Sequence, residues 1–167
     1  MESRTLILSP KKVAIKLERM AWQILERCIG EESIVLAGIA PQGFYLAEKL
    51  AIHIAKISSV KVNLISIEMN KSNLLGSEIR LSEKLSDCEN KVVFVVDDVL
   101  NTGRILLHGI NAFLNTPIKS LHTVVLVNRE HNLFPVRADV SGMELSTTLR
   151  EHIEVILDDS GFSVYLV

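Results

Sequence analysis

The 167-residue sequence has few cysteines, few prolines, few aromatic residues and almost no net charge. Its two cysteines, Cys28 and Cys88, lack the spacing of metal ligands, so we expect free thiols in a reducing compartment. A formal net charge of −2 excludes a strong positive field over the whole molecule, of the kind that attracts nucleic acid. No apolar stretch approaches the length of a membrane span, and no basic segment followed by an apolar run opens the chain. We therefore expect a cytoplasmic protein that does not bind membranes.

The sequence does contain short apolar runs that alternate with amphipathic segments. The periodicity predicts helices over residues 11–28, 44–56 and 104–113, and strands over residues 34–39, 60–69, 92–96 and 120–127, with a closing hairpin of residues 154–157 and 162–167. Ser9 and Pro10 suit the start of the first helix, and Gly30 suits its end. Residues 70–90 and 134–148 are polar and lack a clear period, and the first of these segments is typical of a functional lid. The alternation predicts one α/β domain over residues 1–167, with a mostly parallel central sheet flanked by helices.

Residues 92–104 form the stretch with the clearest chemical meaning. Five apolar residues predict a strand buried on both faces, and Asp97 and Asp98 follow at its expected end. A loop with Thr102 and Gly103 then leads into a helical pattern. The backbone N–H groups of this loop would lie at a helix N-terminus, an arrangement that binds anions.

An apolar strand that ends in two aspartates is not by itself specific to one class of protein. A nucleotide hydrolase of the P-loop class has such a strand, but it would also need G-x-x-x-x-G-K-[ST], and this pattern does not occur in the sequence. Two aspartates that only cap a helix would account for the acids but not for the following Asn-Thr-Gly-Arg.

The string Val-Val-Asp-Asp-Val-Leu-Asn-Thr-Gly-Arg, residues 95–104, resembles the phosphoribosyl-pyrophosphate motif of the type I phosphoribosyltransferases. Within that superfamily the chain resembles the bifunctional pyrimidine-operon regulator and uracil phosphoribosyltransferase family. The likeness runs through nearly the whole chain and includes residues 6–8, 19–21, 38–39, 43–47 and 135–139.

The resemblance implies that the chain transfers a phosphoribosyl group from phosphoribosyl pyrophosphate to a nucleobase, with uracil as the family's base, in a fold that carries a small β hood. It implies Mg²⁺ as the cofactor, catalytic roles for Asp97, Asp98 and Arg129, and a catalytic lid over residues 70–90. It implies a hood over the nucleobase at residues 139–145. The substrate-binding residues that it implies are Val99, Leu100, Asn101, Thr102, Gly103, Arg104, Ala40, Pro41, Gln42, Gly43, Asp139 and Val140. Asp158 and Asp159 match acidic positions that could hold the metal, and a hairpin turn explains them equally well. A homodimer and a messenger RNA partner are further family expectations.

The sequence departs from the family pattern at several positions that would contact phosphate. Pro41 and Gln42 stand where the family has threonine and arginine, so a charged donor and a backbone N–H are lost. Further departures are Ile105, Asn128, Glu130, Val140 and residues 70–73. A second class of function is therefore a nucleotide-binding regulator with weak or no turnover. RNA binding is a special case of this class, for which the sequence offers only scattered basic residues at Lys12, Lys16 and Arg19.

Overall fold

The computed structural model describes residues 4–76, 78–146 and 151–167, whose strands form two sheets. The larger sheet has six strands in the order β4-β3-β2-β5-β6-β7, and the smaller has three in the order β1-β9-β8. The strands are β1 (Thr5–Leu8), β2 (Ser33–Ile39), β3 (Lys61–Glu68), β4 (Arg80–Leu81), β5 (Val92–Leu100), β6 (Ser120–Asn128), β7 (Val140–Glu144), β8 (Ile153–Asp158) and β9 (Gly161–Leu166). The helices are α1 (Pro10–Glu26), α2 (Gln42–Ile57), α3 (Arg104–Asn111) and the short 3₁₀ helix η1 (Leu85–Cys88).

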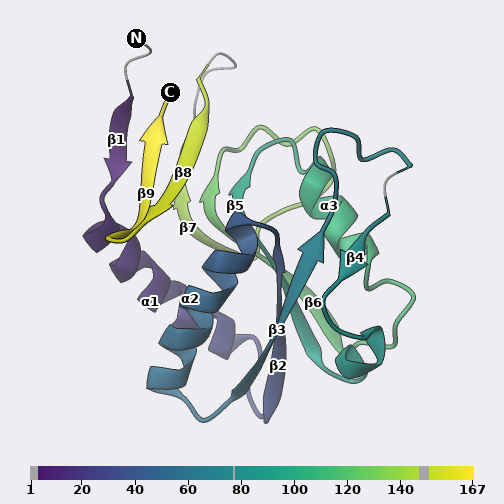
Figure 1. Ribbon diagram of the computed structural model, residues 1–167. Coiled ribbons are helices and arrows are strands. Elements are labelled where there is room, and N and C mark those ends of the chain that lie inside the picture. Colours follow the sequence, from purple (N-terminus) through teal and green to yellow (C-terminus); the bar gives the residue numbers. More distant parts are fainter. Residues whose placement is uncertain (1–3, 77, 147–150) are drawn as a thin grey trace.

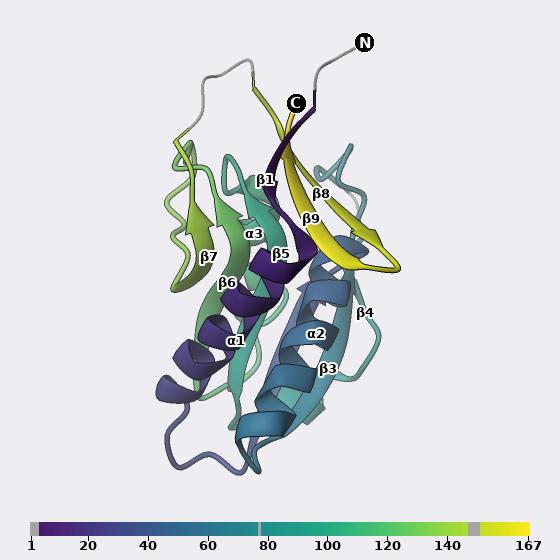
Figure 2. The same cartoon turned by 90° about the vertical axis from the view of Figure 1, so that its left-hand side faces the viewer.

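The larger sheet is parallel except at β4, which pairs antiparallel with the end of β3. Helices α1 and α2 lie side by side on one face, and α3 lies on the other (Figures 1 and 2). Strands β2 and β5 are buried on both faces, which explains why their sequences are continuous apolar runs. The predicted fold, a mostly parallel central sheet flanked by helices, is confirmed.

The helix boundaries differ from the predictions by a few residues. Helix α1 ends at Glu26, before the predicted Cys28, and Gly30 adopts a left-handed φ of 84° further along. Ser9 has the extended backbone of an N-cap, but within the described chain its side chain makes no capping bond. No helix in the described residues is long and apolar enough to span a bilayer.

Three sequence predictions about strands are wrong. Strand β5 does not end before the aspartates, because β6 continues to pair with it as far as Leu100. Residues 134–148 are not wholly irregular, since β7 extends the larger sheet beside β6. Residues 70–90 contain β4 and η1 rather than one long loop.

The smaller sheet lies near the carboxyl ends of the parallel strands (Figure 1). Its inner side chains join the core beneath α1 and α2; they are Leu8, Val155, Phe162 and Val164. The predicted closing hairpin is confirmed as β8 and β9, and β1, which was not predicted, pairs with β9. This three-stranded sheet, hereafter the hood, is the element that covers the ends of β2 and β5.

Candidate active site

The strand order creates a crevice between β2 and β5. The chain leaves β2 toward β3 on one side and leaves β5 toward β6 on the other, so the connections diverge at this point. Open α/β sheets bind ligands at such a switch point, outside the carboxyl ends of the strands. Residues 40–43 follow β2 and residues 101–104 follow β5, so both predicted substrate loops meet here.

Asp97 and Asp98 lie near the carboxyl end of β5, at this switch point. The Asp97 side chain is buried, and its Oδ1 accepts a hydrogen bond of 3.0 Å from the Asp98 amide. Asp98 is less buried than Asp97, and its Oδ1 accepts a hydrogen bond of 2.9 Å from the amide of Val99. Burial raises the pKa of Asp97 well above its ordinary value, the Asp98 charge raises it further, and Lys71 opposes the shift. A carboxyl group whose pKa is raised by burial, beside a second carboxylate, can serve in acid–base chemistry.

The loop after β5 leads into the N-terminus of α3, an arrangement that is able to bind anions. Gly103 adopts a left-handed φ of 88°, which turns the chain into α3, and its carbonyl accepts the first helical bond, from the Leu107 amide at 2.9 Å. The amides of residues 103–106 therefore have no acceptor within the described helix. The Thr102 hydroxyl makes a 3.4 Å contact with the Arg104 amide, at the same helix start.

The turn after β2 is held tightly against β5. A Cβ on Gly43 would lie 2.5 Å from the Val96 carbonyl oxygen and 3.0 Å from the Asp97 Cα, so only glycine fits there. The Ala40–Pro41 peptide bond is cis, and α2 begins at the next residue. The predicted pyrophosphate turn thus lies against the backbone of the paired aspartates.

Lys71 is a site residue that was not predicted. Its Nζ lies 3.9 Å from Asp97 Oδ1, and its side chain is 32% exposed. It comes from the segment after β3, which lies beside the start of α3. Between them is an open cavity of about 350 Å³ lined by Lys71, Ser72, Asn73, Leu74, Leu75, Thr102, Arg104 and Ile105. That volume is typical of a small-molecule site. Lys71 follows the end of β3 by three residues and lies within the predicted lid, but no sequence pattern indicates its approach to Asp97.

Arg129 lies beside the loop after β5 rather than open to the crevice. Arg129 is 4% exposed. Its Nη1 donates a hydrogen bond of 3.1 Å to Asn101 Oδ1, and its Nη2 donates one of 2.6 Å to the Glu151 carbonyl. On the other side of the site, Gln42 Nε2 donates a hydrogen bond of 3.4 Å to the Val155 carbonyl. The buried Oε1 of Gln42 has no hydrogen-bond partner in the described chain. Both substrate loops are therefore tied to the backbone leading into and along β8 of the hood.

Four predicted site residues lie away from the paired aspartates. Val140 is the first residue of β7 and is buried in the core, two strands from β5. Asp139 precedes it and accepts a 3.0 Å bond from the Thr123 amide. The prediction of a hood at residues 139–145 is wrong, because these residues largely form the outermost strand of the larger sheet. Asp158 and Asp159 lie in the β8–β9 turn, where Asp158 Oδ1 accepts 2.8 Å from the Ser160 amide.

Bonding to Ser160 lowers the pKa of Asp158, so the turn explains this acid without a metal. Among the described residues no three histidine, cysteine or acidic side chains cluster as a metal site. Both cysteines are free and buried, and burial raises the pKa of each thiol.

Comparison with known sequences gives a match over most of the chain. A family model described as "Phosphoribosyl transferase domain" matches residues 3–159. The curated "Bifunctional protein PyrR" of Macrococcus caseolyticus is 33% identical over 162 residues, covering 93% of this chain and 93% of that protein. The protein of the same name from Clostridium botulinum is 35% identical over 167 residues, covering 95% of this chain and 92% of that one.

Solved structures give a match at the level of the fold. The hypoxanthine phosphoribosyltransferase of Trypanosoma cruzi superposes with a TM-score of 0.77 at 18% identity, covering 96% of this chain and 95% of that one. A hypoxanthine-guanine phosphoribosyltransferase from Bacillus anthracis superposes with a TM-score of 0.75 at 20% identity, covering 98% and 99%.

Proposed function

The chain belongs to the phosphoribosyl transferase domain family, and from that premise we propose that it transfers the phosphoribosyl group of phosphoribosyl pyrophosphate to uracil, forming a nucleoside monophosphate and pyrophosphate. The observation that carries the proposal is the meeting of the paired aspartates with the N-terminal amides of α3 at the switch point of the sheet.

The 5′-phosphate is proposed to bind at the start of α3. Amides of residues 103–106 and the Thr102 hydroxyl would donate to its oxygens. An anion at a helix N-terminus gains about 0.3–1 kcal/mol, or up to about 2 kcal/mol when partly buried, so several converging donors are needed. Ile105 lies in the first turn of this helix, and without a hydroxyl it adds only its amide.

Asp97 and Asp98 are proposed to bind the two ribose hydroxyls. As the bond from C1 to pyrophosphate breaks, positive charge develops on the ribose ring, and a nearby carboxylate stabilises it. Burial strengthens this interaction because little water screens it.

The oxygen donors of the site fit magnesium, which proteins bind through one or two carboxylates together with substrate phosphates. Asp97 and Asp98 are the residues that would hold it, since Asp158 and Asp159 lie in the hairpin turn. When bound, the ion would balance the charge of the departing pyrophosphate.

Lys71 is proposed to supply the cationic contact that Gln42 does not. Gln42 can donate a hydrogen bond but cannot neutralise a phosphate, and its amide is bound to the hood. Lys71 projects from the lid to within 3.9 Å of Asp97 and borders the cavity above the start of α3. A lysine ammonium there would meet a pyrophosphate or phosphate group as the lid closes.

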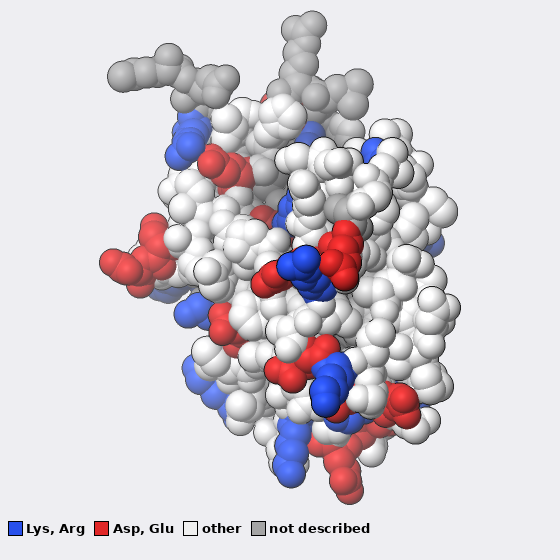
Figure 3. All heavy atoms as spheres, turned by 45° about the vertical axis from the view of Figure 1, so that its right-hand side comes forward, with Lys and Arg blue, Asp and Glu red and all other residues white. Residues whose placement is uncertain are grey.

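A nucleotide-binding regulator with little turnover is the second candidate. The neutral Pro41-Gln42 pair and Ile105 favour it, because both weaken phosphate contacts while the ribose-binding pair is retained. RNA binding has less support. Arg19 Nη2 donates a hydrogen bond of 2.6 Å to the Gly142 carbonyl, and Arg27 Nη2 donates one of 2.7 Å to the Asp139 carbonyl. Both arginines are therefore bound to β7 or to the residue before it. On the face in Figure 3, basic and acidic side chains are interspersed.

The test is a transfer assay with radiolabelled uracil, phosphoribosyl pyrophosphate and Mg²⁺, separating nucleotide from base. The matched control is the Asp97→Asn/Asp98→Asn double variant, checked for folding by circular dichroism. Turnover above that of the variant supports the transferase. Equal rates, with calorimetric binding of uridine monophosphate to the wild type alone, would favour the regulator.

A further inference from the structure

Strand β3 has an outer edge that is only partly covered. Along one side it pairs with β2 from Lys61 to Ile67. Along the other side it pairs with β4 only at Ile67 and Glu68, because β4 has two residues. The stretch of residues 61–65 is therefore an open sheet edge.

The direction of the backbone groups on this edge follows from the bonds of its neighbours. The Lys61 amide donates a 2.9 Å hydrogen bond to the Glu32 carbonyl, and the Ile67 carbonyl accepts a 2.9 Å hydrogen bond from the Ala40 amide. The backbone N–H and C=O groups of odd-numbered residues of β3 therefore point toward β2. The Ser66 carbonyl accepts 3.0 Å from Ser82, on the opposite side. Because direction alternates along a strand, the N–H and C=O groups of Val62 and Leu64 point outward. The described part of the chain offers these four groups no partner.

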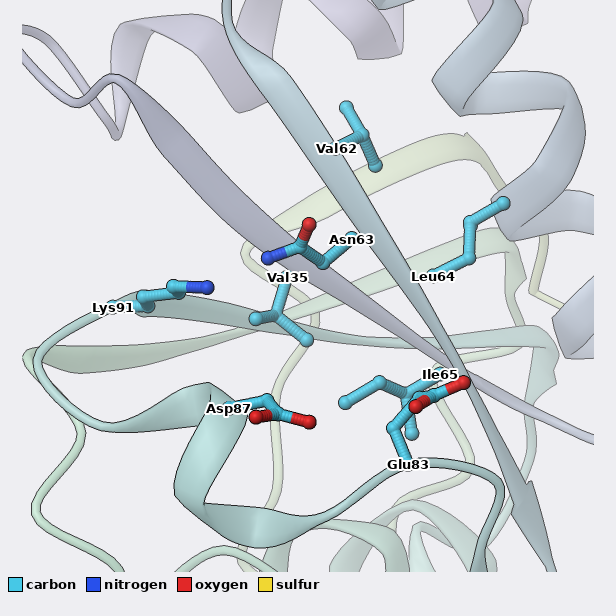
Figure 4. Close-up of a pocket in the computed structure, with 8 residues that line it drawn as sticks. All are labelled: Val35, Val62, Asn63, Leu64, Ile65, Glu83, Asp87 and Lys91. Carbon is cyan, nitrogen blue, oxygen red and sulfur yellow. The ribbon is translucent and has the colours of Figure 1, made fainter.

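A cavity of about 450 Å³ adjoins this edge, between β3 and η1 (Figure 4). Its floor is apolar, formed by the buried side chains of Val35 and Ile65. Its rim carries Glu83, Asp87 and Lys91, and Figure 4 shows Lys91 extending toward Val35 and Asn63 while Asp87 points toward Ile65 from η1. The rim thus holds two acidic groups and one basic group, and Glu83 and Asp87 are exposed.

We propose that the free edge of β3 is a docking site for an extended peptide segment of a partner protein. The segment continues the line of β4, pairs with the outward groups of Val62 and Leu64, and places one apolar side chain over Val35 and Ile65. A lysine or arginine of the segment faces Glu83 and Asp87. Addition of a strand to an open edge is a general mode of peptide recognition, in which main-chain bonds give affinity and pockets for alternate side chains give specificity.

Charge favours such a peptide over a second copy of this chain. Two copies joined edge to edge through β3 would form one continuous sheet, with η1 of each copy on the same face. In each copy the acidic residues Glu83 and Asp87 outnumber the basic Lys91, so two rims of net negative charge would then approach one another, and like charges repel. A basic peptide has the complementary charge.

The experiment is a fluorescence-polarisation titration of the full chain against the labelled heptapeptide Lys-Thr-Val-Thr-Val-Thr-Lys. Two matched peptides serve as controls. One carries N-methyl groups at alternate residues, so it keeps the side chains but loses the backbone donors, and the other has glutamate in place of both lysines. We expect each control peptide to bind at least about tenfold more weakly, the effect of losing one or two hydrogen bonds or a charge pair.

Two variants locate the binding on the protein. Leu64→Pro removes an outward N–H while leaving the bonds to β2, because the Leu64 amide points away from β2. The pair Glu83→Lys and Asp87→Lys reverses the rim charge, and Glu89→Lys is the control outside the cavity lining. Circular dichroism melts check that each variant folds. We expect Leu64→Pro to lose binding, and the rim variant to prefer the glutamate peptide.

Three results would overturn the proposal. These are equal affinity for the N-methylated peptide, no binding of the lysine peptide at millimolar protein, and a wild-type dimer that Leu64→Pro converts to a monomer without any peptide binding. The last result would assign the edge to a second copy instead.

Discussion

Asp97 is a buried carboxyl group, and its ion-pair partner, the Lys71 ammonium, lies 3.9 Å away on a partly exposed side chain. A charge in such a place costs folding free energy, and it persists in natural proteins where function needs it. Replacement of Asp97 by a neutral residue should therefore change stability and activity in opposite directions.

We predict that Asp97→Asn makes the protein more stable and nearly inactive. The raised pKa of Asp97 means that the wild type loses stability as pH rises from the ordinary aspartate pKa through the raised one, whereas asparagine does not titrate. The melting temperature of the variant should exceed that of the wild type by a margin that grows as the pH rises above about 4, the ordinary aspartate pKa. Transfer should fall by about a hundredfold or more. Asp87→Asn is the control, and a variant less stable than the wild type at neutral pH would contradict the prediction.

Lys71 provides a second prediction at the residue scale. Lys71→Met should raise the KM for phosphoribosyl pyrophosphate by about tenfold, because a charged contact to phosphate contributes about 1.5–3 kcal/mol. Lys71→Arg keeps the charge and should restore most of the affinity. Steady-state kinetics with varied phosphoribosyl pyrophosphate measure both. Equal KM values for the methionine variant and the wild type would show that Lys71 does not meet the substrate.

Gln42 stands where the family has arginine, so a substitution at this position can restore the positive charge. Gln42→Arg should lower the Kd for pyrophosphate by about tenfold, since a guanidinium forms paired, charged bonds with phosphate oxygens. Gln42→Lys tests charge without the planar geometry and should give a smaller gain. Isothermal calorimetry with magnesium pyrophosphate measures the change. Unchanged affinity in both variants would mean that this turn does not contact pyrophosphate.

At the scale of elements, the turn from β2 into α2 depends on a single missing side chain. Gly43→Ala would bring a methyl group to 2.5 Å from the Val96 carbonyl oxygen, so α2 must shift away from β5. We expect a loss of about 1–3 kcal/mol in unfolding free energy, as for other overpacked sites, together with reduced transfer. Gly30→Ala is the control: its Cβ would meet no atom within 4 Å, and only the left-handed φ of 84° opposes it. Urea unfolding of both variants measures the difference, and equal losses would contradict the packing argument.

The elements that the sequence predicted are those whose own residues determine them. β2, β5 and β6 each contain a run of at least four apolar residues, which is the pattern of a buried parallel strand. β7 was missed because its five residues include Gly142 and two polar residues, and its pairing with β6 is decided by packing. Gly142 is required there because a Cβ would lie 2.7 Å from the Leu126 carbonyl oxygen, a contact that no sequence pattern reports.

The candidate site also contains residues that could be predicted from the sequence and residues that could not. The paired aspartates and Gly103 could be predicted because they adjoin along the chain. Lys71 could not be assigned from sequence, since its approach to Asp97 depends on how the lid folds over α3. The Glu151 and Val155 carbonyls also could not, because backbone atoms have no signature in side-chain identity.

At the scale of the whole molecule, an exposed apolar area surrounds α3. Leu114 is 63% exposed and Leu133 is 80% exposed, near a cavity of about 320 Å³ lined in part by Leu107 and Phe134. Apolar area of this kind commonly marks an association surface. We propose that two copies of the chain associate here.

We predict that the wild type sediments as a dimer and that Leu114→Lys/Leu133→Lys sediments as a monomer. Ile29→Lys is the control, because Ile29 is also highly exposed but lies far from α3 along the chain. Sedimentation velocity at several protein concentrations gives the answer. A wild-type monomer at every concentration would contradict the dimer, and an unaffected dimer in the double variant would place the interface elsewhere.

The bonds that hold the hood over the site have a consequence for how this fold diversifies. Gln42 and Arg129 both donate to main-chain carbonyls, at Val155 and Glu151. Every amino acid supplies that carbonyl, so the attachment survives replacement of the hood's side chains as long as its backbone path is kept. We therefore expect the two loops at the switch point to be more constrained in sequence than the side chains of the hood. Under the proposed function, the covering surface, and with it the choice of nucleobase, could then change while the loops beneath keep their sequences.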